Sequence, residues 1–71
     1  MVEIVKINPL LLNIPLQELR DDDLVNIFEY RLSASMYQRF VLATIPEAEL
    51  SAEYALATKK ELLKRLKNKA A

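Results

Sequence analysis

The chain has 71 residues, of which 52% are apolar, and contains no cysteine, histidine or glycine. A chain this short has room for one small domain, and these absences exclude disulfides and the common zinc and iron ligand sets as the means of stabilising it. We therefore expect the fold to depend on helix packing or on association, because a short apolar chain cannot bury all of its apolar surface within itself.

The 10 basic and 10 acidic side chains cancel in number but are unevenly distributed. Residues 1–58 carry four basic and nine acidic side chains, whereas residues 59–71 carry six basic side chains and one acidic one. Such a basic segment suits an acidic protein surface or nucleic acid. No apolar stretch approaches the roughly 20 residues of a membrane span and no signal peptide is recognisable, so we expect a cytoplasmic protein without membrane contact.

The N-terminal part, residues 1–20, is expected to cover the rest of the fold. Residues 2–7 are β-branched and roughly alternating, which favours a short strand or an extended arm, and a lone strand would need a partner from another molecule. Asn8 and Pro9 indicate an N-cap followed by the first residue of a helical turn. A second turn is expected after Pro15.

Two long helices are predicted in the remainder of the chain, over residues 22–44 and 46–68. Asp21, Asp22 and Asp23 are expected to cap the first helix, because short carboxylates accept hydrogen bonds from free N–H groups and favour the positive end of the helix dipole. The predicted fold class is all-α, a hairpin of two long helices with a short extended or helical N-terminal segment, and we expect it to dimerise.

Apolar side chains surround nearly the whole of the predicted 22–44 helix. One stripe contains Leu24, Phe28, Leu32, Met36 and Phe40, and a second contains Tyr30, Ala34, Tyr37 and Val41. A helix of this kind is usually buried on all sides, and one partner helix with a short cover segment is too small to achieve this. Association is the expected solution, most simply as a homodimer. The alternative is a monomer in which leucines of residues 1–20 cover the second stripe.

An aromatic and basic group in the second half of this helix is the candidate partner-binding site, because Tyr and Arg are enriched in interaction hot spots. Its members are Tyr30, Tyr37, Arg39, Phe40 and Val41. The alternative is that the aromatic side chains belong to the core and the arginine is solvated.

The predicted 46–68 helix is amphipathic and is expected to pack one apolar face on the core. That face consists of Ala52, Ala55, Leu56, Leu62, Leu63 and Leu66, with Lys59 interrupting it. The opposite side supplies a candidate basic face, formed by Lys60, Lys64, Arg65 and Lys67.

Catalytic and cofactor motifs are missing from the sequence. Without histidine or cysteine the usual nucleophile–base pairs are excluded, and without glycine so are phosphate-cradling loops. We expect no enzyme activity, no metal and no cofactor. The predicted function is a non-catalytic protein–protein interaction module, such as an adaptor, inhibitor or regulatory subunit. The alternative is a small nucleic-acid-binding regulator that uses the basic face, including a ribbon-helix-helix arrangement in which residues 2–7 pair between two chains.

Overall fold

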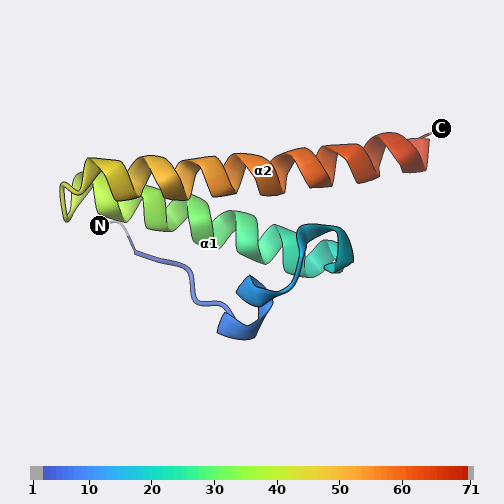
Figure 1. Ribbon diagram of the computed structural model, residues 1–71, viewed down its shortest axis with the longest axis horizontal. Helices are drawn as coiled ribbons and strands as arrows, with labels where there is room; N and C mark the ends of the chain where they lie inside the picture. The colour runs from blue at the N-terminus through green and yellow to red at the C-terminus, as the bar shows by residue number, and fades with distance from the viewer. Residues whose placement is uncertain (1–2, 71) are drawn as a thin grey trace.

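The structure of the chain is a computed structural model that describes residues 3–70. Helix α1 (Asp21–Phe40) packs antiparallel along helix α2 (Ile45–Ala70), and a short N-terminal segment lies along α1 (Figure 1). The predicted all-α hairpin with a short N-terminal segment is therefore confirmed. The last turns of α2 extend beyond the beginning of α1 (Figure 1), and side chains of these turns reach back to the first residue of α1.

The hairpin turn begins earlier than the sequence predicted. Helix α1 ends at Phe40, whereas the apolar pattern predicted a helix through residue 44. The backbone N–H of Thr44 donates to the carbonyl of Gln38 at 2.8 Å, and Ala43 adopts a left-handed conformation with φ of 57°. This arrangement satisfies carbonyl groups at the end of α1 and reverses the chain. Apolar periodicity could not reveal it, because Val41, Leu42 and Ala43 of the turn are themselves apolar.

The start of α1 also differs from the prediction. The N-cap position belongs to Arg20, whose side chain makes no capping hydrogen bond, and the three aspartates occupy the first turn. The predicted side-chain cap is therefore wrong, although negative charge does lie at the positive end of the helix dipole. The carboxylate of Asp21 instead accepts hydrogen bonds from Arg65 and Lys69 of α2.

The N-terminal segment is an extended arm followed by two short 3₁₀ turns, Pro9–Asn13 and Leu16–Glu18. The predicted cap is confirmed, since the side chain of Asn8 accepts a hydrogen bond from the backbone N–H of Leu10 at 3.1 Å. Residues 3–7 form no strand, and residue 2 lies outside the described residues. The N–H of Val5 donates instead to the Ser33 hydroxyl at 3.0 Å, which attaches the arm to α1.

The core has two parts with different packing. At the start of α1, Leu19, Leu24 and Ile27 are buried together beneath apolar side chains of the N-terminal segment and of α2. Nearer the hairpin turn the helices meet through small residues, since Ala48 is fully buried and its carbonyl accepts a 2.7 Å hydrogen bond from Ser35. Small side chains at this contact leave little apolar surface buried there.

Candidate interaction surfaces

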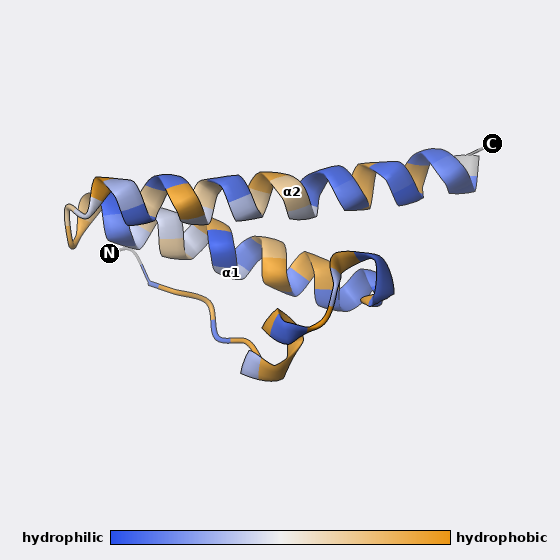
Figure 2. Cartoon of the chain, in the orientation of Figure 1, coloured by the Kyte–Doolittle hydropathy of each residue, from blue (hydrophilic) through white to orange (hydrophobic). Residues whose placement is uncertain are grey.

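One side of the hairpin carries a row of exposed and half-buried apolar side chains on both helices, interrupted by Lys59, which we call the hairpin face. Its members are Val25, Phe28, Leu32 and Met36 of α1 and Ala52, Leu56, Leu63 and Leu66 of α2. Leu32 and Met36 are 43% and 44% exposed, and Leu56 and Leu66 are 50% and 61% exposed. Alternating bands of apolar residues along both helices are visible in Figure 2.

The positions on the two helices belong to the same side because of their spacing and contacts. Val25 lines one depression together with Leu62 and Leu66, which joins the two helices at this end of the hairpin face. Leu32 and Met36 follow Val25 at intervals of seven and four, which keeps them on the same side of α1. The arm lies elsewhere on α1, near Tyr30 and Ser33, and therefore does not cover the hairpin face.

Helical geometry explains why the first predicted stripe of α1 is only partly buried. Residues four apart advance by slightly more than one turn, so a row with that spacing winds around the helix. The stripe accordingly starts at the fully buried Leu24 and ends at Phe40, which is 69% exposed.

The apolar face predicted for α2 was only partly right. Ala55 is buried against α1, whereas Leu56, Leu63 and Leu66 do not pack into the core. These three leucines belong to the hairpin face instead, since they lie beside the helix contact and not within it.

The predicted partner-binding group does not form one cluster. Tyr30 lines a depression beneath the N-terminal arm, and Tyr37 is half-buried. Arg39, Phe40 and Val41 are exposed beside the hairpin turn. These last three residues remain accessible to a partner, whereas Tyr30 is partly occupied by the chain itself.

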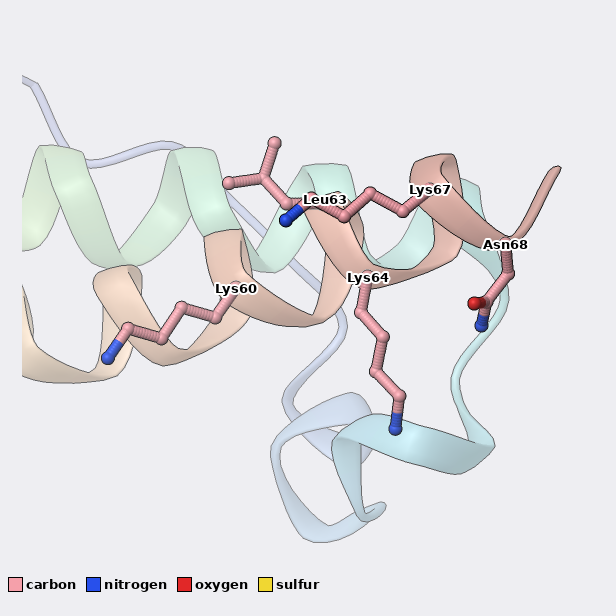
Figure 3. Close-up of a pocket in the computed structure, with 5 residues that line it drawn as sticks. All are labelled: Lys60, Leu63, Lys64, Lys67 and Asn68. Carbon is pink, nitrogen blue, oxygen red and sulfur yellow. The ribbon is translucent and has the colours of Figure 1, made fainter. Parts of the chain in front are cut away.

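Most of the predicted basic face does come together. Lys60, Lys64 and Lys67 line a shallow, open depression of about 320 Å³ with Leu63 and Asn68, all from the last turns of α2 (Figure 3). The three lysines are exposed. The depression therefore combines positive charge with one apolar side chain.

Arg65, the fourth residue of the predicted basic face, points elsewhere. Its guanidinium donates to the carboxylate of Asp21 at 2.8 Å and to the carbonyls of Leu16 and Gln17 at 3.1 and 3.2 Å. It also pairs with Glu61 at 3.3 Å, one turn earlier in α2. Sequence reasoning missed this role, because no local pattern shows which residues of α1 and the N-terminal segment lie beside the end of α2.

The Asp21 carboxylate is the acceptor of this ion-pair network. Hydrogen bonds from Lys69 and from Arg65 hold the pKa of Asp21 below its ordinary value. The hydrogen bond to Asp21 likewise raises the pKa of Arg65. Both shifts favour the charged forms, so the network connects the two helices as an ion pair at neutral pH.

A second cationic side chain joins the helices through an aromatic ring. The guanidinium of Arg31 lies 4.2 Å from the centre of the Tyr54 ring, which is a cation–π arrangement. The Nε of Arg31 is buried and has no hydrogen-bond partner. The contact therefore joins α1 to α2 through an aromatic ring and not through a carboxylate.

Across residues 3–70, His, Cys, Asp and Glu side chains form no group of three or more that could hold a metal ion. Within the same residues no helix is sufficiently long and apolar to cross a membrane. Comparison with protein families, curated proteins and solved structures gives no match to this chain.

Proposed function

We propose that the protein is a non-catalytic protein–protein interaction module of the cytoplasm that acts through the hairpin face, as an adaptor, inhibitor or regulatory subunit. The observation that carries this proposal is the set of half-exposed leucine and methionine side chains on one side of both helices. Contiguous exposed apolar surface is typical of interaction sites and rare elsewhere on soluble monomers. Self-association as a homodimer is one way to cover it.

Capture of partner proteins with matched variants tests this proposal. Leu32→Gln and Leu56→Gln introduce polar side chains into the hairpin face without disturbing the buried core, and glutamine is a good helix former. Leu10→Gln is the matched control, because Leu10 is 69% exposed but belongs to the N-terminal segment. We expect the original chain and the control to retain the same protein, and the hairpin-face variants to lose it. Equal retention by all four proteins would contradict the proposal.

Nucleic-acid binding is the second candidate function, and the shared depression of Lys60, Lys64 and Lys67 is the observation that favours it. The three lysines extend in different directions from the same turns of α2 (Figure 3), and exposed cationic side chains of this kind can neutralise phosphates. Fluorescence anisotropy with duplex DNA and single-stranded RNA in about 0.1 M salt tests it, since exposed charges are screened beyond about 10 Å under these conditions. Micromolar affinity that the triple change to glutamine abolishes would favour this candidate over the protein-interaction module.

A further inference from the structure

We propose that the hairpin face of one chain packs on the hairpin face of a second copy, giving a four-helix bundle in which α1 of each chain lies against α2 of the other. This inference rests on the proposed function and specifies the partner and the geometry. It depends on two properties of the hairpin face, its size and the arrangement of charge along its edges.

The size of the hairpin face suits a stable dimer. Helix α1 has 20 residues and is therefore about 30 Å long, and two adjacent helices present a side about 20 Å wide. The projected area is about 600 Å², and its accessible area is larger because side chains protrude from it. Stable interfaces bury about 800 Å² of each partner. A second copy can therefore cover the hairpin face.

The antiparallel packing of the hairpin determines which residues lie level with one another along its length. Ser35 of α1 contacts Ala48 of α2 near the turn, and Asp21 contacts Arg65 at the far end. The two contacts span 14 residues of α1 and 17 of α2, so at a constant rise per residue they give the level of each residue between them to within about one turn.

Interpolation between the two contacts places Glu29 of α1 close to the level of Leu56 of α2, and little more than one turn from the level of Lys60. Rotation of a second copy about a two-fold axis parallel to the helices keeps every residue at its own level while it brings α1 against α2 of the other chain. Levels within one hairpin therefore predict which residues approach one another between the two copies.

The charges along the two outer edges of the hairpin face are complementary in that arrangement. The α1 edge carries Asp22 and Glu29 in its first half, and the α2 edge carries Lys60 and Lys67 in its second half, all of them exposed. Helical spacing places these four residues beside the apolar members of the hairpin face and not among them. The rotation brings Glu29 within about one turn of Lys60 of the second copy, and Asp22 within about one turn of Lys67, distances that long lysine side chains can span. Each pair occurs twice in the dimer.

The proposed interface also has to accommodate the lysine within the hairpin face. Lys59 lies between Leu56 and Leu63 in the sequence of α2 and interrupts the hairpin face, where an isolated ammonium would be costly to cover. Its long apolar stem can pack on the interface while the ammonium extends to the rim.

Exchange of the paired charges provides the first test, using Glu29→Lys and Lys60→Glu in sedimentation velocity at low ionic strength. Each variant alone places like charges at both symmetry-related pairs, and we expect about tenfold weaker dimerisation than for the original chain. An equimolar mixture of the two variants restores opposite charges at both pairs and is expected to dimerise as well as the original chain. Glu18→Lys in the N-terminal segment is the control and should leave dimerisation unchanged.

Disulfide formation provides the second test, because the chain has no cysteine of its own. Glu29→Cys mixed with Leu56→Cys joins two positions at nearly the same level and is expected to give a cross-linked dimer under mild oxidation. Each variant alone should cross-link at least about tenfold more slowly, because a disulfide needs Cα atoms within about 7 Å of one another. Faster cross-linking of Glu29→Cys to itself would overturn the arrangement in favour of α1 against α1. Circular dichroism checks that each variant remains helical.

A chain that stays monomeric up to high micromolar concentration would overturn the dimer altogether. That result would leave the proposed function standing or falling on the capture experiment, because a different protein could still occupy the hairpin face. A chain that dimerises but captures no other protein would support the dimer and would contradict an adaptor or inhibitor that binds a different protein through the hairpin face. The two proposals are therefore separable by experiment.

Discussion

The guanidinium of Arg65 lies 2.8 Å from the carboxylate of Asp21, and this ion pair joins the end of α2 to the beginning of α1. The same guanidinium donates to the carbonyls of Leu16 and Gln17, so it also holds the last turn of the N-terminal segment. One side chain thus connects all three parts of the fold, next to the cluster of buried residues at the start of α1.

Replacement of Arg65 should therefore loosen more than one ion pair. We expect Arg65→Gln to lower the melting temperature and to increase hydrogen exchange in residues 9–20. Arg65→Lys should recover only part of the loss, because a single ammonium cannot reproduce the planar set of donors. Lys64→Gln, one position earlier and exposed, serves as the control. Equal melting temperatures for Arg65→Gln and Lys64→Gln would show that the network contributes nothing.

The network also predicts a pH dependence. The pKa of Asp21 is held below its ordinary value by Lys69 and Arg65, so the native state favours the ionised carboxylate more than the unfolded chain does. The resulting stabilisation is fully present above about pH 4, near the unfolded pKa of an aspartate, and disappears as the pH falls through the native-state pKa.

Thermal unfolding of the original chain and Asp21→Asn between about pH 2 and pH 7 measures this dependence. The difference in melting temperature should be largest near neutral pH and should shrink below about pH 4. Asp22→Asn is the control, because Asp22 is exposed in the same helical turn. A difference between the original chain and Asp21→Asn that stays constant down to the lowest pH would contradict the proposed cause.

The hairpin turn offers a stabilising substitution. Ala43 has a φ of 57°, a conformation that costs a residue with a Cβ atom about 1 kcal/mol and that glycine adopts freely. Ala43→Gly should therefore raise the free energy of unfolding by a few tenths to about 1 kcal/mol, with the greater freedom of the unfolded glycine opposing part of the gain. Urea denaturation measures it, and Ala57→Gly within α2 should have the opposite sign. Destabilisation by Ala43→Gly would argue against the left-handed turn.

The close approach of the two helices at Ala48 predicts a destabilising substitution. This residue is fully buried, and its carbonyl accepts the hydrogen bond from Ser35. Ala48→Leu should lower the free energy of unfolding by about 1–3 kcal/mol, because the larger side chain forces the helices apart. Ala57→Leu on the exposed side of α2 is the matched control and should change it by less than about 0.5 kcal/mol. Chemical denaturation of both variants provides the comparison.

Local signals in the sequence determined the elements of this fold. Two long apolar patterns with a break between them predicted the hairpin, and Asn8 followed by Pro9 predicted the capped turn that the structure contains. The prolines also indicated the short turns of residues 9–20. These features depend on interactions between residues a few positions apart, which is why one sequence suffices to predict them.

Tertiary packing decided which apolar residues became core and which stayed exposed. The sequence could not single out one row of α1 as the core, because apolar residues nearly encircle this helix, and only contacts with α2 and the N-terminal segment select Leu24 and Ile27 for burial. Packing also turned Arg65 from a residue of the predicted basic face into the link between three segments. Helix periodicity fixes the angle of a side chain around its own axis, but the side on which a neighbouring helix packs depends on contacts distant in sequence.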